Sequence, residues 1–572
     1  DLMPSDITGT DVLEEDKESG GRISVTDEQL SSGIVAWWLN QGQTNGPWRQ
    51  NIGGDNVDKW PTLDPTHRQV TEQDLANRFE ISTAADLVAF ATQVNSVDGT
   101  YVAYLTNDID MKGVNWTPIG TKTHPFVGLF NGGGHTIDNL TYNATTSDAG
   151  LFGPLGLRAE IRDVTLGEHS AITSTANAVG GIAVSDKNTG TVKFINCGNN
   201  APIKGSYNVG GILGAVYFDT QLILEMTDCF NQGLITATTK GETGTGESAA
   251  ICAATKSNAL VTRCWNLGSV TSSTTGLQPY RTGKFFVYGT DHITRCYNWD
   301  AYGTGERAQE GVDTFNIYDL NNGTLCYKLN AEDNNPDHHL PWQQNLANPY
   351  TPLSFIGQEG EGKGVHYTRT LSSTTGTIVL PYDVASNDSV QFYVLTGVND
   401  GEEKVTFSPV DVLEGGTPAL FVTTGTGDYE FLGCNENLST DAFNELCITS
   451  RPVTIGNWTM QGSNIEQEFT KPAELATLYY ISGGQVKNAT KKLTVGAYRS
   501  YFTGPDATTG SAVQALNIIF GPRTEGITPL SSSAAGEAVG IFNTQGQRLN
   551  APQRGLNIFR TTSGKSIKVL LK

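Results

Sequence analysis

The stretch YNVGGILGAVYF, Tyr207–Phe218, decides the fold because its small-residue pair and the apolar residues around it return at a regular interval. The chain has NAVGGIAVSDKN thirty residues upstream and DAGLFGPLGLRA a further thirty residues before that. β-rich runs such as TVKFINC and LVTRC lie between these phrases and predict strands. Stacked repeats of this length predict a parallel β-helix, in which each coil adds about 4.8 Å of height. Related phrases occupy 149–153, 179–184, 209–214, 248–253 and 284–289.

Composition limits the classes of protein to which the chain can belong. Its 572 residues predict about two to four domains. The 65 glycines and only 17% charged residues favour turn-rich β structure. The net charge of −22 argues against a nucleic-acid partner, because nothing offsets repulsion from phosphates. No run approaches about 20 apolar residues, so we expect no transmembrane segment, and no signal peptide follows Asp1.

Six of the eight cysteines fall into two groups. Cys434 and Cys447 are a candidate disulfide pair in an oxidising compartment. The chain has no CxxC pair, and we expect neither a metal site nor a cofactor. Four others sit in the phrases FINCGNN, MTDCFNQ, VTRCWNL and ITRCYNW. Stacked coils place these four in one interior column, where thiols act as small apolar fillers: Cys197, Cys229, Cys264 and Cys296.

One segment, 85–143, resembles the opening of the GLUG-repeat β-helices of Bacteroidetes surface proteins. It has the motifs LTNDID, WTPIG and FVGLFNGGGHTIDNL in that order, and the likeness extends over about 80–300. The resemblance implies a right-handed parallel β-helix in an adhesin-like surface or secreted protein. It also implies a backbone-organising role for His135 in its glycine-rich turn. Residues 84–94 have apolar side chains at helical spacing and are predicted to cap the open end of the β-helix.

A second, longer repeat joins 30–61 to 320–352, and it resembles the segment that closes a GLUG array. Because a closing segment should follow an array, we predict that the gene product extends before Asp1 through another β-helix. The repeat contains tryptophans that invite a sugar-stacking hypothesis, against the alternative that they pack the segment onto the last coil. These tryptophans are Trp37, Trp38, Trp48, Trp60 and Trp342. His338 and His339 are predicted to lie in a surface loop rather than at a metal site.

The C-terminal third changes in character after about 366. Strand-like runs between glycine, asparagine and proline turns predict a β-sandwich. The composition of GPRTEGITPLSSSAAGEA predicts a linker. The basic tail after it resembles the C-terminal sorting domains of type IX secretion. The triplet Asp388-Ser389-Val390 fits a short O-glycosylation sequon of the same phylum.

The predicted fold is therefore all-β: a β-helix, then a β-sandwich, then a small C-terminal β module. The predicted domains are a closing unit of a preceding array at 1–70, a GLUG-type β-helix with its capping helix at 71–310, a second closing unit at 311–365, a β-sandwich at 366–520, a linker at 521–537 and a sorting-like module at 538–572.

These features predict a non-enzymatic scaffold outside the cell or on its surface, exported across the outer membrane. Its expected partner is a host glycan or an extracellular protein, and its termini could attach it to the outer surface. One alternative is a carbohydrate-active β-helix, a polysaccharide lyase or glycoside hydrolase, which needs carboxylates at matching heights on one face. Another is a structural component of a surface layer or filament. The candidate carboxylates stand in different repeat contexts: Asp108, Asp110, Asp163 and Asp228.

Overall fold

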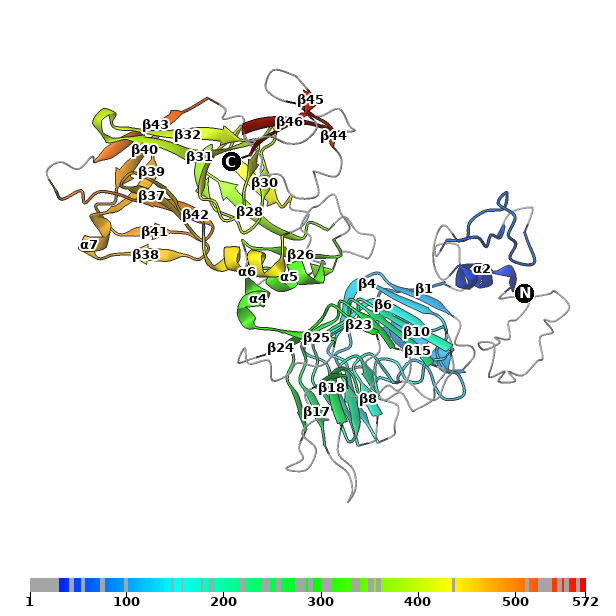
Figure 1. Ribbon diagram of the computed structural model, residues 1–572. Helices are drawn as coiled ribbons and strands as arrows, with labels where there is room; N and C mark the ends of the chain where they lie inside the picture. Colours follow the sequence, from blue (N-terminus) through cyan, green and yellow to red (C-terminus); the bar gives the residue numbers. More distant parts are fainter. Residues whose placement is uncertain are drawn as a thin grey trace. The chain divides into compact units, whose positions relative to one another are not determined.

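The computed structural model divides into two compact units, Asp1–Leu320 and Asn321–Lys572 (Figure 1). This division falls inside the segment 311–365, and the finer domain boundaries stay predictions. The structure describes residues 30–40, 46–52, 57–71, 78–96, 101–145, 149–156, 158–175, 178–184, 190–214, 222–238, 247–253, 259–272, 284–286, 292–300, 311–330, 340–347, 354–355, 362–434, 438–509, 514–522, 538–542, 548–549, 555–561 and 566–571.

The first unit is a parallel β-solenoid, as predicted from the repeats, and its walls are three sheets. One wall has 14 strands. They are β1 (Arg78–Ile81), β2 (Val102–Leu105), β3 (Ile109–Asp110), β4 (Leu129–Asp138), β6 (Glu160–Leu166), β10 (Gly190–Ile195), β11 (Gly198–Asn199), β15 (Leu222–Thr227), β16 (Phe230–Asn231), β19 (Ala259–Thr262), β20 (Trp265–Asn266), β23 (His292–Thr294), β24 (Cys296–Trp299) and β25 (Val312–Phe315).

The second wall consists of β5 (Thr141–Ala144), β7 (Ala171–Ser174), β12 (Ile203–Gly205), β17 (Ile235–Ala237) and β21 (Val270–Ser272). The third wall consists of β8 (Ala178–Gly180), β9 (Ala183–Val184), β13 (Asn208–Gly210), β14 (Leu213–Gly214), β18 (Glu247–Cys252) and β22 (Lys284–Phe286).

The repeated phrases stack in the third wall, which confirms the prediction made from their period. Val209 pairs in parallel with Val179 on one side and with Ser248 on the other. The glycines of these phrases are needed because neighbouring backbones come close together. A Cβ atom at Gly181 would collide with Gly211 O, and one at Gly211 would collide with Ala250 O.

The expected capping helix is present as α3 (Ala84–Ser96), with Leu87, Phe90, Ala91 and Val94 buried. The ring of Phe90 lies 6.2 Å from that of Phe126 and 6.1 Å from that of Phe130, measured between centroids. The helix thus joins the core that fills the first coils. It places side chains over apolar residues that would otherwise face water at this end.

The two copies of the long repeat have the same local structure. In the first copy, after α2 (Ile34–Leu39), the side chain of Asn40 donates to Trp48 O at 2.7 Å and accepts from Trp48 N at 2.8 Å. In the second copy, Asn330 makes the same pair of bonds to Trp342, at 2.8 and 3.0 Å. We call residues 30–70 and 320–368 the first and second clasp, because each amide side chain closes a loop onto a tryptophan backbone.

The second unit contains a ten-stranded sheet. Its strands, in spatial order, are β29 (Thr375–Ile378), β34 (Ala419–Thr423), β31 (Val390–Asn399), β32 (Lys404–Val410), β43 (Ala515–Phe520), β40 (Gln485–Asn488), β39 (Leu478–Ser482), β42 (Arg499–Thr503), β37 (Trp458–Ser463) and β36 (Val453–Ile455). A separate four-stranded sheet contains the strands of the second clasp. Its strands, in spatial order, are β27 (Ser354–Phe355), β26 (Trp342–Asn345), β28 (Val365–Leu371) and β35 (Gly427–Leu432).

The remaining strands of this unit form small sheets. They are β30 (Val384–Ala385) with β33 (Val412–Leu413), β38 (Gln467–Phe469) with β41 (Leu493–Val495), and the C-terminal sheet of β44 (Ala538–Phe542), β45 (Arg548–Leu549), β46 (Gly555–Thr561) and β47 (Ser566–Leu571). The described helices of this unit are α5 (Thr324–Leu329), α6 (Thr440–Ile448) and α7 (Pro472–Leu475), and α4 (Ile317–Asn321) ends at its first residue.

Candidate functional site

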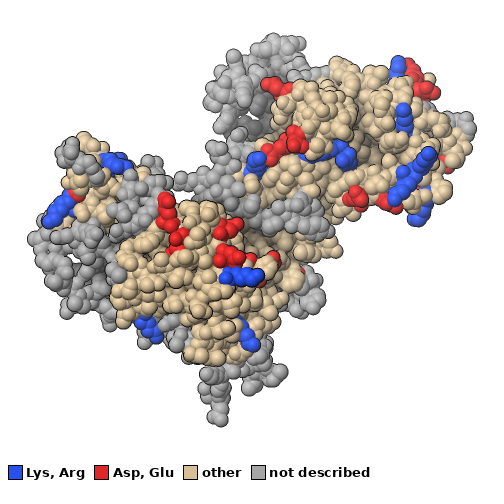
Figure 2. All heavy atoms as spheres, turned by 180° about the vertical axis from the view of Figure 1, so that it is seen from behind, with Lys and Arg blue, Asp and Glu red and all other residues tan. Residues whose placement is uncertain are grey.

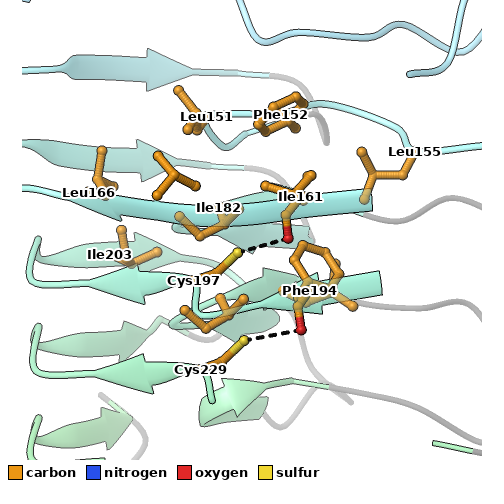
Figure 3. Close-up of a cluster of buried hydrophobic side chains, with 14 of the residues drawn as sticks. Leu151, Phe152, Leu155, Ile161, Leu166, Ile182, Phe194, Cys197, Ile203 and Cys229 are labelled. Atoms are coloured by element: carbon orange, nitrogen blue, oxygen red, sulfur yellow. Dashed lines mark hydrogen bonds between the residues drawn. The ribbon is translucent and has the colours of Figure 1, made fainter. Parts of the chain in front are cut away.

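The predicted thiol column is present inside the solenoid. The Cys197 thiol donates to Ile161 O at 3.2 Å, and the Cys229 thiol donates to Phe194 O at 3.5 Å, each to the preceding coil (Figure 3). Burial raises the pKa of Cys229, Cys264 and Cys296 well above the ordinary value for a thiol. Since the thiolate is the nucleophile and the metal ligand, these side chains are suited to filling space rather than to chemistry.

The column predicts a simple pattern of thiol reactivity. In the native protein, a maleimide should leave Cys197, Cys229, Cys264 and Cys296 unlabelled, because their side chains are at most 1% exposed and the reagent cannot reach them. Half-buried Cys434 should react first. Mass spectrometry of the labelled protein locates the adducts, and labelling in guanidinium chloride is the control in which all eight cysteines react. Rapid native labelling within the column would contradict the packing.

An asparagine ladder runs beside the thiols, two residues further along each coil. Asn199 donates to Asn231, Asn231 to Asn266, and Asn266 to Asn298, each from Nδ2 to Oδ1 at 2.8 Å. All four residues are fully buried. The ladder was not predicted from the sequence, although the recurring Cys-x-Asn spacing in the four phrases is a signal for it.

A column of left-handed residues precedes the thiols and turns the chain at one corner. Asp228 and Arg263 in this column have φ of 57° and 53°. Arg263 binds both carboxylate oxygens of the fully buried Asp228 at 2.7 Å. Burial by itself would lower the pKa of Arg263, but its hydrogen bonds with Asp228 and the charge of that carboxylate outweigh this and raise it. The other left-handed members are Asp163, Asn196, Arg295 and Gly311.

The four candidate catalytic carboxylates are therefore engaged in internal contacts. Asp163 accepts from Asn196 at 3.0 Å, and Asp228 is bound by Arg263. Asp108 accepts from Thr136 N at 2.9 Å and Asp110 from Lys112 N at 3.0 Å, as in carboxylates that organise turns. Asp228 and Asp163 belong to the corner column, whereas Asp108 directly precedes β3 and Asp110 is its last residue.

The histidines of the first coils also pair with carboxylates. His135 Nδ1 lies 3.2 Å from Asp108 Oδ1, which ties its glycine-rich turn to the preceding strand. His169 Nδ1 lies 2.8 Å from Asp138 Oδ2, and the hydrogen bond and negative charge of Asp138 raise the pKa of His169. Among the described residues, no three His, Cys, Asp or Glu side chains are grouped so as to hold a metal ion.

The outer face of the first wall is the main candidate for ligand contact. Parallel pairing aligns Lys193 with Glu160 and Glu225, and then Glu225 with Leu260. Lys193 Nζ lies 3.1 Å from Glu225 Oε2. Ile223 is 37% exposed and Leu260 44% exposed on the same face, which leaves apolar surface beside the ion pair. On the face of the molecule that Figure 2 shows, charged side chains are sparse over much of the described surface and gather in small groups of mixed sign.

Threonines occupy the next outward-facing position along these strands, two residues further on. Thr227 pairs with Thr262, and Thr262 pairs with Thr294. The hydroxyls of Thr262 and Thr294 lie 3.0 Å apart. The wall therefore presents hydroxyl, charged and apolar groups at the regular spacing of neighbouring strands, about 4.8 Å. We call Ile223, Glu225, Leu260, Thr262 and Thr294 the flank.

The first clasp covers the start of the same wall. Leu30, Ile34 and Trp37 of the clasp pack in one cluster with Val102 of β2 and Leu129 of β4. Val102 and Leu129 face outward in the same file of residues as Glu160, yet both are fully buried. The outer face is therefore apolar in the coils that the first clasp covers, and polar or charged in the coils that follow. The flank lies in these later coils.

The tryptophans are placed mainly in cores. Trp37 is 6% exposed and Trp342 fully buried, so neither offers a ring face to a sugar, and the stacking hypothesis is wrong for these two. Trp48 and Trp60 are half-buried, and Lys59 Nζ lies 4.8 Å from the centre of the Trp60 ring. The Trp38 side chain, like His338 and His339, lies outside the described residues.

The candidate disulfide between Cys434 and Cys447 is not formed, and all eight cysteines are present as thiols. Cys447 lies in α6 and its sulfur donates to Asn322 O at 3.3 Å, within the second clasp. Burial raises the pKa of Cys434 to about 11. Helix α6 packs against the second clasp, where the ring of Phe443 stacks on that of Tyr327. Because of this packing, the Cys447 thiol contacts Asn322 instead of Cys434.

A polar groove of about 540 Å³ lies in the second unit, between the turn before β31 and strand β35. It includes the predicted sequon residues Asp388 and Ser389, both exposed. Asp428 and Glu430 contribute carboxylates, which are bound by Thr370 and Lys363 respectively. The groove offers acceptors for hydroxyl or ammonium groups but no buried reactive group among its lining residues.

Comparisons with known proteins give limited likenesses, and no family model matches the chain. A segment is 31% identical over 157 residues to halomucin of Haloquadratum walsbyi, which is 25% of this chain and 2% of halomucin. The chain thus spans only a small fraction of that relative. A structure of a Bacteroides ovatus protein described as a "putative immunoglobulin A1 protease" aligns with a TM-score of 0.30 and 17% identity, over 44% of this chain and 87% of that one. The chain is a repeat protein with a β-solenoid, and the described part contains no helix long and apolar enough to cross a membrane.

Proposed function

We propose that this chain is a non-enzymatic extracellular or cell-surface protein, an adhesin-like scaffold whose flank binds a host glycan or protein. The observation that carries the proposal is the contrast between the two sides of the first wall. The inward side is packed with buried apolar residues, thiols and the asparagine ladder. The outward side presents exposed Ile223 and Leu260 beside a Lys193–Glu225 ion pair and a row of threonines.

An outer face of this kind supports binding more readily than catalysis. Catalytic acids and bases need free carboxylates that converge on a bond. Here, Asp163 and Asp228 are bound by Asn196 and Arg263, and both belong to the corner that shapes the coils. Regularly spaced hydroxyl and apolar groups instead suit an extended ligand that contacts several coils. Export to the cell surface, GLUG-type repeats and a sorting-like tail remain part of the proposal.

The full chain should be tested on an array of glycans and extracellular-matrix proteins. We expect specific retention of one ligand class, and binding about tenfold weaker in the double variant Ile223→Lys/Leu260→Lys, because two charges would replace apolar contact on the flank. The matched control is Leu234→Lys/Thr236→Lys. Leu234 is 47% exposed and adjoins the second wall, so this control adds the same charge elsewhere on the solenoid.

Three outcomes would contradict the proposal. Equal loss in the control variant would mean that charge, not the flank, governs binding. Release of reducing ends from a polysaccharide, abolished by a carboxylate substitution, would favour the carbohydrate-active alternative. Assembly of the purified chain into filaments without retention of any ligand would favour the surface-layer alternative.

A further inference from the structure

Two arginines of the second unit lie near each other without a carboxylate to neutralise them. Arg369 belongs to β28 and is half-buried, whereas Arg499 is the first residue of β42 and is exposed. Within the described part of the chain, neither guanidinium forms an ion pair. Two unneutralised cations at one point are unusual in a chain with a net charge of −22, and they attract anions.

Thr377 of β29 connects the two arginines. Arg369 Nη1 donates to Thr377 O at 2.9 Å. The Thr377 hydroxyl donates to Ser500 O at 2.9 Å and accepts from Ser500 N at 3.0 Å. Because Ser500 directly follows Arg499, these bonds hold the backbones that carry both arginines at the same place, where β29 meets β42.

The guanidinium of Arg369 is fixed in position, but its donors are not all used. Arg369 Cζ lies 5.5 Å from the centre of the Phe421 ring, so the ring supports the planar group by a cation–π contact. Arg369 Nε is buried and has no hydrogen-bond partner among the described residues. Buried donors without a partner are uncommon in folded proteins, and a bound ion is one of their explanations.

The electrostatic state of this place also favours an anion. Burial, and then the positive charge of Arg499, lower the pKa of Arg369 to about 10. Tyr367 lies two residues before Arg369 on the same face of β28. Burial raises the pKa of Tyr367, and the charges of both arginines oppose that rise. A bound anion would relieve the repulsion between the two guanidiniums.

We propose that Arg369 and Arg499 form a binding site for one oxyanion group: a sulfate, a phosphate or a carboxylate. Arginine binds such groups with parallel N–H···O bonds, which add direction to the attraction between charges. Since Arg499 is exposed, the group can belong to a free anion or to a glycan that carries it. The inference goes beyond the proposed function, because it concerns the second unit and does not involve the flank.

Isothermal titration calorimetry of the full chain with inorganic sulfate tests the site, at an ionic strength held constant with NaCl. We expect Arg499→Gln to weaken sulfate binding about tenfold, because it removes one of the two guanidiniums. The matched control is Arg451→Gln, which removes the same charge from another exposed position of this unit and should stay within about threefold of the parent. Arg499→Lys keeps the charge without the planar donors and should give an intermediate loss.

Titration with a sulfated chondroitin disaccharide separates the two sources of the group. Tighter binding of the disaccharide than of inorganic sulfate, lost in Arg499→Gln, would support a glycan, and equal binding would support a free anion. No sulfate binding by the parent chain, or equal weakening in Arg499→Gln and Arg451→Gln, would overturn the inference. Sulfate binding that is weakened in Arg499→Gln but unchanged in Ile223→Lys/Leu260→Lys would support it even if the flank has no ligand.

Discussion

Arg263→Ala is expected to lower the free energy of unfolding of the solenoid by about 3–5 kcal/mol. The substitution leaves Asp228, whose side chain is fully buried, without the guanidinium that binds both of its oxygens at 2.7 Å. Loss of one partner of a buried ion pair is more costly than loss of an exposed pair, because the remaining charge stays in a medium of low polarity. Chemical denaturation monitored by circular dichroism measures the change.

The matched control is Arg295→Ala, one coil further on. Arg295 has the same left-handed φ of 53° but is exposed, so its replacement should cost about 1 kcal/mol or less. The double variant Asp228→Asn/Arg263→Ala should recover part of the loss, because it removes the buried charge. Similar losses for Arg263→Ala and Arg295→Ala would show that backbone strain at the corner, rather than the ion pair, sets the cost.

Asn231→Ala is the second substitution with a large expected effect, about 3–5 kcal/mol. Asn231 accepts from Asn199 and donates to Asn266, both at 2.8 Å, and also donates to Gly233 O at 3.0 Å. The alanine variant leaves buried partners on two neighbouring coils without one of their hydrogen bonds, and such groups are costly because water cannot reach them.

The control for the ladder is Asn298→Ala, at its last described position. This substitution removes one of the 2.8 Å ladder bonds instead of two and should cost about half as much. Hydrogen exchange of the amides in β16 and β20 should show where protection is lost. Equal costs at the two positions would mean that the ladder does not act as a chain of mutually dependent bonds.

The relation between the clasp and the flank shows why an outer face cannot be assigned from sequence alone. Val102, Leu129, Glu160 and Lys193 occupy one outward file of the same wall. Alternation along each strand predicts which residues face outward, but whether they meet water depends on a segment about 30 residues or more away in the sequence. Only the packing of Trp37 and its neighbours on Val102 distinguishes a covered position from an exposed one.

The sequence by itself determined the solenoid, the capping helix and the thiol column. Parallel pairing in register places each repeat on the previous one, so a 30-residue period in Val179 and Val209 is sufficient to predict their stacking. The helical spacing of 84–94 is likewise a local property, and it is reproduced in α3. These features depend on periodicity, which a single sequence displays directly.

Tertiary structure alone decided the fate of side chains whose partners are distant in the chain. The candidate pair of Cys434 and Cys447 failed because α6 packs on the second clasp, more than 100 residues earlier in the sequence. Trp342 is buried and Trp48 only partly so, although the two occupy matched positions in the two copies of the repeat. Burial and pairing of this kind depend on which surfaces meet, and contacts between segments that lack a shared period leave no repeating pattern in the sequence.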